Sequence, residues 1–438
     1  MQRRSSLWLL LLALGCVERG EVLRPQANEG VESDGGAGGA GGSGGSGGLG
    51  ATGGTAGVGA VAGSAGAPTP SAVLSLVSLG ATHSTAVSAN RLYAWGNNAS
   101  GELGQGDTVE RHEPTQVPGD IQFSTVAGGG NAEEHGFTCA LDEIGAAYCW
   151  GANTRGQLGQ GDRTERHAPV RVPLPVAARG ISNDFEHVCA LLADASLYCW
   201  GRNQEGELGQ DDRVPPTNDD TARDALEPVQ VPGTDWSFVD TGDGHTCGIR
   251  FDGSLWCWGR NSQHQLGPSN EGQIRHPIQV GTDTDWLRVD SGQQAAIALK
   301  QDHSLWVWGT NVASSSEGGF PLGIDAEELT TPTRLGTATD WLAISTRVFH
   351  SCAVNRAEEL WCWGRNIEGQ LGTGDTTIRK EPTLVATGIT DVDVSWFMTC
   401  ALTRSGGLEC TGGNEHGQLG TGDTERPLRF TDITPPPL

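Results

Sequence analysis

Short runs of alternating apolar and polar residues fill most of this chain, and glycines bound many of them. The stretch from Cys139 to Gly151, CALDEIGAAYCWG, shows the pattern. Alternation over a few residues, with β-branched and aromatic side chains and glycine at the ends, is typical of short β-strands. Helical periodicity is absent between these runs, so we expect an all-β protein.

The same run returns at intervals of about fifty residues, which is the spacing of a repeat protein. A Thr411-Gly412 pair marks a degenerate seventh copy, and a Trp-Gly pair marks the other six, at Trp95, Trp150, Trp200, Trp258, Trp308 and Trp363. An asparagine and a glycine-rich turn ending in Leu-Gly follow most of these pairs. Each unit predicts a strand, a turn, a second strand, a glycine-rich loop and a third strand such as residues 114–117.

Several strands in each copy fit the blade of a propeller better than the unit of a helical solenoid. The seven copies lie between about residue 73 and about residue 430. A closed ring removes the exposed sheet edges that an open stack would leave. We therefore expect a seven-bladed β-propeller over residues 73–438.

Five units carry two cysteines ten positions apart. If Cys139 faces Cys149 across a hairpin, Leu141 pairs with Ala147, and the three-residue loop ends on Gly145, where a left-handed backbone is common. Opposed strand residues lie within the distance that a disulfide accepts. The spacing predicts five disulfides: Cys139–Cys149, Cys189–Cys199, Cys247–Cys257, Cys352–Cys362 and Cys400–Cys410.

The units without cysteines support this pairing, because both partners are missing together. Thr85 and Ala94 stand in one unit, and Ile297 and Val307 in the other, so that only Cys16 is left over. No Cys-x-x-Cys spacing indicates a metal site, and we expect neither a metal nor a cofactor. Disulfides suit an exported protein. Buried, reduced cysteine pairs are the alternative.

The N-terminus predicts export. Arg3 and Arg4 precede an apolar run over residues 7–14 that is too short to span a bilayer, so residues 1–16 have the features of a signal peptide. The run ends in LALGC, which resembles a bacterial lipoprotein signal and predicts lipidation of Cys16; simple secretion is the alternative. We expect a protein of the bacterial cell envelope, anchored at the outer membrane or cell surface, or else secreted.

Residues 17–72 are dominated by glycine, with alanine, serine and threonine. Such a segment buries too little apolar surface to offset its ordering entropy, and it predicts a disordered tether, with an end-to-end distance of about 35 Å for the roughly forty residues from 29 to 70. The chain has 53 acidic and 28 basic residues and a net charge of −25, which argues against a nucleic-acid partner. We expect contact with a membrane through the lipid anchor only.

Residues that recur in every unit are expected to be architectural. Tryptophan suits packing between sheets, and asparagine and aspartate suit loop backbone. One carboxylate in each Gly-x-Gly-Asp turn is too few for a calcium site. We expect Arg111 and Arg166, which follow two of these turns, to pair with a neighbouring carboxylate.

Function is expected where the repeat breaks, because loops on a rigid scaffold carry variable chemistry. The breaks span residues 127–137, 211–227 and 312–329, and the candidate binding residues in them are Glu133, Glu134, His135, Asp219, Asp220 and Phe320. Sequence neighbours seldom supply both an acid and a base to one centre, which argues against a catalytic pair in the first break. The sequence has no recognised catalytic motif, and we expect no catalytic residues.

The motifs His-x-Cys-Ala-Leu, Cys-Trp-Gly-x-Asn and Gly-Gln-Leu-Gly-x-Gly-Asp resemble the repeat of the regulator of chromosome condensation family. Matching stretches include residues 245–247, 257–261 and 369–375, and the resemblance covers about 360 residues. The motif's histidine is kept at His83, His187, His245 and His350 and is replaced by Phe137, Ala295 and Met398. The resemblance implies a seven-bladed propeller.

The functions within that family differ. Its founding member promotes nucleotide exchange on the nuclear GTPase Ran at chromatin, another relative is a secreted bacterial inhibitor of β-lactamases, and many members are interaction domains. We expect an exported, non-enzymatic, monomeric module that binds a protein or a surface polymer. One alternative is a regulator of a partner enzyme or GTPase. The other is a polysaccharide hydrolase or lyase, which would need carboxylates from several blades at one end of the central channel.

Overall fold

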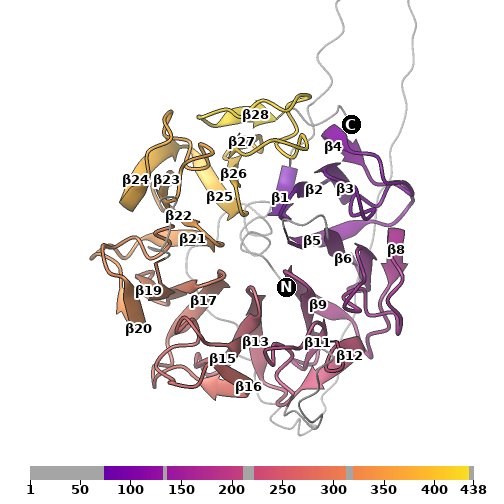
Figure 1. Ribbon diagram of the computed structural model, residues 1–438, viewed down its shortest axis with the longest axis horizontal. Coiled ribbons are helices and arrows are strands. Elements are labelled where there is room, and N and C mark those ends of the chain that lie inside the picture. The colour runs from indigo at the N-terminus through magenta and orange to yellow at the C-terminus, as the bar shows by residue number, and fades with distance from the viewer. Residues whose placement is uncertain (1–73, 132–135, 211–220, 312–318, 434–438) are drawn as a thin grey trace, which may run out of the picture.

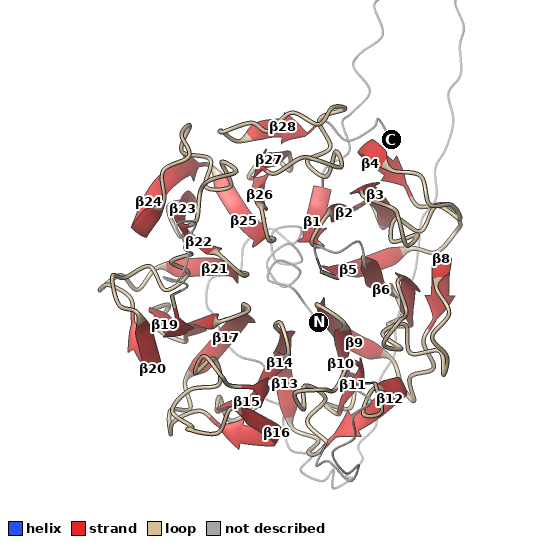
Figure 2. Ribbon diagram, in the orientation of Figure 1, coloured by secondary structure: helices blue, strands red, loops and turns tan. Residues whose placement is uncertain are grey.

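The protein is described by a computed structural model that covers residues 74–131, 136–210, 221–311 and 319–433. These residues form 28 β-strands, and no helix in the described part is long and apolar enough to cross a membrane. The strands make seven four-stranded antiparallel sheets around a central axis (Figure 1), with loops at both ends of each sheet (Figure 2). The prediction of an all-β, seven-bladed propeller is confirmed.

Each blade takes its strands in chain order, from the axis outward. Blade 1 consists of β1 (Leu74–Leu79), β2 (His83–Ser88), β3 (Arg91–Gly96) and β4 (Arg111–Gln116). Blade 2 consists of β5 (Phe123–Gly129), β6 (Phe137–Asp142), β7 (Ala147–Gly151) and β8 (Arg166–Arg171). Blade 3 consists of β9 (Ala178–Asp184), β10 (His187–Leu192), β11 (Leu197–Gly201) and β12 (Ala225–Val231). Blade 4 consists of β13 (Trp236–Thr241), β14 (His245–Arg250), β15 (Leu255–Arg260) and β16 (Gln273–Gln279).

The remaining blades follow the same plan. Blade 5 consists of β17 (Trp286–Ser291), β18 (Ala295–Lys300), β19 (Leu305–Thr310) and β20 (Glu328–Arg334). Blade 6 consists of β21 (Trp341–Thr346), β22 (His350–Asn355), β23 (Glu359–Gly364) and β24 (Arg379–Thr387). Blade 7 consists of β25 (Ile389–Val394), β26 (Met398–Thr403), β27 (Leu408–Gly412) and the short β28 (Thr431–Ile433).

The hairpin between the second and third strands has the register that the cysteine spacing predicts. Cys139 lies opposite Cys149 and Leu141 opposite Ala147, and Gly145 ends the turn with a φ of 81°. The structure joins the ten cysteines of the propeller in five disulfides with Cα–Cα distances of 4.1–4.2 Å. In blade 5 the same positions hold the opposed pair Ile297 and Val307.

Two faces of the ring follow from this strand order. The hairpins between the second and third strands, together with the connections from one blade to the next, form one face, here called the hairpin face. The opposite face holds the connections between the first and second strands and between the third and fourth, and is here called the loop face. Leu74 pairs with Ser88 and Ile433 with Leu408, so both ends of the described chain lie at the hairpin face.

The apolar core lies between blades rather than within them. Seven buried clusters each combine residues from two neighbouring blades. Six of the clusters contain the repeated tryptophan of one blade, whose indole N–H donates to a carbonyl in a loop of the preceding blade. Trp150, for example, donates to the Glu102 carbonyl at 2.9 Å. The architectural role expected for the tryptophans is confirmed.

Side chains on the innermost strands join neighbouring blades a second time. At one equivalent position, a serine or aspartate oxygen accepts the backbone N–H of the next inner strand. Asp240 accepts from Ser291 at 2.6 Å, and Asp290 accepts from Thr346 at 2.7 Å. The other acceptors at this position are Ser78, Ser182, Ser345 and Asp393. In blade 2 the position holds Ala127, which has no side-chain acceptor.

Candidate functional site

The loop face is the candidate functional site, because its connections differ most from blade to blade. Its glycine-rich loops share one internal design. In blade 1, Asn98 Oδ1 accepts the Leu103 N–H, and its Nδ2 donates to carbonyls of the same loop. Arg111 pairs with Asp107 at 2.8 Å, and blade 2 repeats this pair between Arg166 and Asp162. The expected pairing of both arginines is confirmed, and these repeated groups hold the loops.

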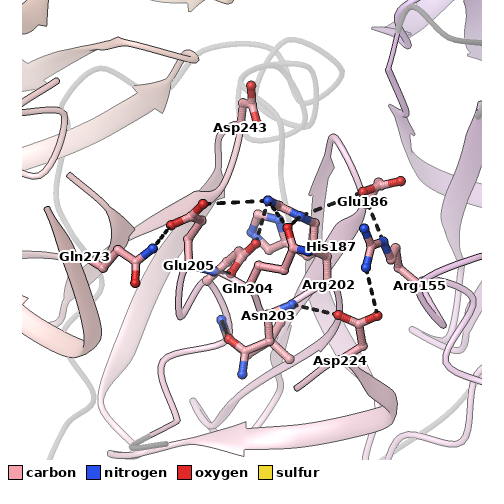
Figure 3. A network of polar contacts seen from close by, with 12 residues as sticks. Arg155, Glu186, His187, Arg202, Asn203, Gln204, Glu205, Asp224, Asp243 and Gln273 are labelled. Atoms are coloured by element: carbon pink, nitrogen blue, oxygen red, sulfur yellow. Dashed lines mark hydrogen bonds and ion pairs between the residues drawn. The ribbon is translucent and has the colours of Figure 1, made fainter. Parts of the chain in front are cut away.

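Charged residues gather on the loop face where blades 2, 3 and 4 meet, here called the charged sector (Figure 3). Arg202 follows β11, and its Nη1 lies 2.8 Å from Glu207 Oε1, while Glu186 and Glu205 lie 3.9 Å away. Arg155, from the β7–β8 connection of blade 2, contacts Glu186 at 3.7 Å. The sector therefore contains arginines and carboxylates that pair with each other.

Burial changes the acidity of two carboxyls in this sector. Glu207 is completely buried, and desolvation raises its pKa to about 7, although the Arg202 guanidinium opposes the shift. Desolvation likewise raises the pKa of Asp224, against the effect of Arg163 at 3.1 Å. Both groups belong to the packing under the loops and offer little surface to a ligand.

Three aromatic residues, Phe349, Trp396 and Phe397, gather on the loop face of blades 6 and 7. Together with Arg365 they are here called the aromatic sector. The three rings are partly exposed, and their centroids lie 6.2–6.5 Å apart. The Arg365 guanidinium lies 4.6 Å from the Phe349 ring centroid and 5.7 Å from that of Phe397. The residue that precedes the second strand is small or polar in the other blades: Thr82, Gly136, Glu186, Gly244 and Gln294.

A buried ion pair reaches across the central channel near the loop face. Arg347 follows β21 in blade 6 and lies 2.9 Å from Asp184, which ends β9 in blade 3. The two side chains are only 5% and 4% exposed. Blades 3 and 6 are not neighbours, so this contact exists only because the ring is closed. Four equivalent positions hold glycine: Gly80, Gly129, Gly242 and Gly292.

The four motif histidines lie buried between blades. His83, His187 and His350 contact Thr138, Thr246 and Thr399 of the following blade at 2.9–3.0 Å. Opposite His245 the equivalent residue is Ala296, and in the described residues no hydrogen-bond partner reaches His245 Nε2. Desolvation, with a nearby arginine as a second cause, lowers the pKa of each of the four to about 3. They are neutral packing groups.

Most of the candidate residues from the sequence fall outside the part that the structure describes. These are Cys16, Glu133, Glu134, His135, Asp219 and Asp220. Phe320 is described, is partly buried, and has the Lys380 ammonium 4.8 Å from its ring centroid. The sequence did not indicate the aromatic sector. Its signal was the replacement of small or polar residues by Phe349 and Phe397 at one position of the repeat.

A catalytic carboxylate cluster would need acidic groups free to meet a substrate. On the inner strands, Asp240, Asp290 and Asp393 accept backbone N–H groups of the next blade. The carboxylates of the charged sector contact arginines. Within the described ranges, no group of three or more His, Cys, Asp or Glu residues is placed to hold a metal ion. What this face offers is a surface with a charged and an aromatic sector.

The chain matches models of a known repeat family. The model of the regulator of chromosome condensation (RCC1) repeat matches residues 90–132, 145–190, 194–249, 252–299 and 358–402. The chain belongs to the RCC1 repeat family. A second model of the same repeat matches residues 236–265. The resemblance inferred from the sequence motifs is thereby confirmed.

Relatives of this RCC1-repeat chain are diverse. It is 26% identical over 321 residues to the ultraviolet-B receptor UVR8 of Arabidopsis thaliana. These residues make up 70% of this chain and 57% of that protein. It is 28% identical over 313 residues to the mouse E3 ubiquitin-protein ligase HERC2. These residues make up 71% of this chain and 5% of that protein. The chain thus spans little more than half of the first relative and a small part of the second.

Solved structures share the fold. Human WBSCR16 superposes with a TM-score of 0.68 at 20% identity, over 80% of this chain and 94% of that one. Yeast RCC1 (Prp20), in a complex with Kap60, superposes with a TM-score of 0.66 at 22% identity, over 78% of this chain and 83% of that one. At this identity the likeness establishes the propeller fold alone.

Proposed function

We propose that this chain is an exported, lipid-anchored, non-enzymatic module that binds a protein partner or a surface polymer through its loop face. The observation that carries the proposal is the aromatic sector. Partly exposed tryptophan and phenylalanine rings are side chains that protein interfaces favour, and the buried Arg365 guanidinium contacts two of these rings. Export and anchoring rest on residues 1–16 of the sequence and on the predicted lipidation of Cys16.

The position of the chain ends supports binding at the loop face. Leu74 and Ile433 both lie at the hairpin face, on the opposite side of the ring. A tether that leaves from Leu74 therefore does not begin among the loops that would meet a partner. The loop face stays accessible in a chain held by its N-terminus.

Regulation of a partner enzyme or GTPase is the second candidate function. A study of yeast Prp20p, which has the same fold, concerns its binding to Gsp1p and histones, and another Prp20 structure contains Kap60. Those partners are properties of the yeast protein, and the signal peptide predicted here directs this chain elsewhere. The third candidate, a polysaccharide hydrolase or lyase, has less support, because the carboxylates described near the channel contact backbone amides or arginines.

Affinity capture with the full mature chain tests the proposed binding. Proteins and polymers of the producing cell's envelope would be captured by the wild-type chain and by the Trp396→Ala variant. The Leu384→Ala variant is the matched control, because Leu384 is 44% exposed on β24, away from both faces. We expect a component that the wild type and the control retain and that Trp396→Ala loses at least tenfold. Equal retention by all three proteins would remove the aromatic sector from the proposal.

A further inference from the structure

Three large apolar side chains are exposed on the hairpin face of blades 2 to 4. Ile144 is 79% exposed at the tip of the β6–β7 hairpin, and Phe251 is 62% exposed at the tip of the β14–β15 hairpin. Val176, in the connection between β8 and β9, is 43% exposed. Single exposed apolar residues need no explanation, but three on one side of one face do.

One backbone hydrogen bond and one cation–π contact link these residues into one surface. The Gly145 carbonyl, next to Ile144, accepts the Ala178 N–H at 2.8 Å. The neighbouring Arg179 extends toward blade 4, where its guanidinium lies 5.4 Å from the Phe251 ring centroid. We call Ile144, Val176, Arg179 and Phe251 the hairpin strip.

The acidic residues beside the strip are mostly engaged within the protein. Asp142 Oδ1 accepts the N–H groups of Ile144 and Ala146, and Asp252 Oδ1 accepts both the N–H and the hydroxyl of Ser254. Glu143 accepts from the Asn90 side chain. These carboxylates shape the turns, so the apolar side chains form the tips. These three carboxylates outnumber the single arginine of the strip.

The N-terminal tether joins the propeller beside this strip. Leu74, the first described residue, pairs with Ser88 at the hairpin end of blade 1. Two residues later Asn90 contacts Glu143, the immediate neighbour of Ile144. Residues 17–72, between the predicted lipid site and the propeller, have the glycine-rich composition from which a tether is predicted. The described chain therefore begins at the same face as the strip, and a surface that holds the predicted anchor lies within reach of this face.

We propose that the hairpin strip rests on the lipid bilayer that carries the anchor. This inference deepens the proposed function and rests on its lipid anchor. Apolar tips with a flanking arginine suit the boundary between headgroups and acyl chains, where the arginine keeps its charge in water. The tether predicted from the sequence would hold the strip near the membrane at an effective concentration on the order of millimolar, so a weak contact is enough. The loop face then points away from the membrane.

Hydrogen exchange of the lipidated full chain on vesicles tests this arrangement. The vesicles would contain phosphatidylethanolamine and phosphatidylcholine, and the reference is the same chain in detergent. We expect exchange at the β6–β7 and β14–β15 turns to slow on the order of fivefold on vesicles, with no change on the loop face. Equal exchange at these turns in both conditions, or protection of the loop face instead, would overturn the inference.

A second measurement does not depend on the anchor. The unlipidated Cys16→Ser chain would be floated with the same vesicles. Two variants of this chain would be floated beside it: the strip variant Ile144→Ser/Phe251→Ser and the control Val109→Ser/Leu384→Ser. The two control residues are 60% and 44% exposed and lie away from the strip. We expect the Cys16→Ser chain and the control to float weakly and the strip variant not to float. Added salt should not reduce this flotation, and anionic lipid should reduce it. Flotation equal in all three, or none in any at lipid concentrations on the order of millimolar, would overturn the inference.

The two experiments separate failure of this inference from failure of the proposed function. An intact mass without the lipid would refute the anchor, and the flotation of the Cys16→Ser chain would still decide whether the strip binds a bilayer. A strip that binds no vesicle but a soluble protein, in a manner that Ile144→Ser/Phe251→Ser abolishes, would overturn the bilayer as its occupant. Partner binding at the loop face is unaffected by either result.

Discussion

The Asp393 carboxylate accepts the Leu79 N–H at 2.8 Å, and this hydrogen bond joins the last blade to the first. Every other pair of neighbouring blades is also linked by the polypeptide chain. Blades 7 and 1 exchange no strand, because β25–β28 and β1–β4 each form a complete sheet. This seam depends on side chains, including the Trp95 indole, which donates to the Gln418 carbonyl at 2.9 Å.

Replacing Asp393 by alanine is therefore expected to loosen the seam. Alanine suits the position, since blade 2 carries Ala127 there, so the fold should survive. Leaving the buried Leu79 N–H unpaired should lower the free energy of unfolding by about 1–3 kcal/mol. Hydrogen exchange should speed up in β1 and β25, and urea unfolding should report the loss of stability.

Asp290→Ala is the matched control, because Asp290 makes the same contact with Thr346 between two blades that the chain connects. We expect a similar loss of stability but a smaller rise in exchange in β17 and β21. Identical exchange behaviour of the two variants would show that the seam is no weaker than other junctions.

His245 Nε2, which has no hydrogen-bond partner among the described residues, predicts a stabilising substitution. His83, His187 and His350 each contact a threonine of the next blade, but Ala296 stands opposite His245. Ala296→Thr should supply the missing partner and raise the free energy of unfolding by about 1 kcal/mol, as measured by urea unfolding.

Val188→Thr, which faces Phe137 rather than a histidine, is the control for that substitution. There the new hydroxyl meets an apolar ring and is expected to destabilise the protein. If both threonines destabilised the protein equally, the histidine–threonine contacts would not be the reason for the pattern.

The five disulfides predict a defined mass and a defined loss on removal. The intact protein should be lighter by ten hydrogens than its reduced form. Cys352→Ile/Cys362→Val copies the natural pair of blade 5, Ile297 and Val307, and should cost at most about 3 kcal/mol, because the bridge closes a loop of about ten residues. Thermal unfolding measures the cost, and free thiols detected in the oxidised wild type would contradict the pairing.

The buried histidines predict acid sensitivity. An unfolded histidine binds a proton near pH 6.5, whereas burial holds the pKa of each folded one at about 3. The unfolded state therefore binds more protons between these values, and stability falls as pH decreases from about 6.5, by at most about 1.4 kcal/mol per pH unit for each histidine. Glu207, Asp224 and Glu409, whose pKa values desolvation raises, act in the opposite direction but are fewer than the four histidines.

The urea midpoint measured from pH 7 to pH 4 checks this expectation. His350→Phe/Thr399→Val copies the Phe137 and Val188 pair of blades 2 and 3, and it should make the decline shallower. A decline of unchanged steepness in this variant would assign the acid sensitivity to other groups.

The sequence predicted the outer part of each blade well, because local spacing determines it. The ten-residue separation of Cys139 and Cys149 alone predicts the hairpin register, without any tertiary contact. The innermost strands were not singled out, although Asp240, Asp290 and Asp393 lie on them. These strands follow short connections and carry neither a cysteine nor the Trp-Gly pair, so the repeat motif does not mark them.

Contacts that depend on ring closure could not be predicted from the sequence. Arg347 and Asp184 are distant in the chain and meet only because blades 3 and 6 lie on opposite sides of the channel. The aromatic sector does not need ring closure, but it combines Phe349 of blade 6 with Trp396 and Phe397 of the next blade, and the sequence did not bring them together. The signal in the sequence was that Phe349 and Phe397 replace small or polar residues at one position of the repeat. This signal becomes informative once the structure places both residues on the loop face.

The antiparallel pairing of β1 with β2 also has a mechanical consequence. If the chain is anchored through its N-terminus as proposed, a partner that pulls on the loop face would apply force along β1, with Leu74 as the fixed point. Their backbone bonds would then be sheared together rather than broken one at a time, and Asp393 would brace the far end of the same strand at Leu79. The first strand of the propeller is thus oriented to withstand tension applied at Leu74.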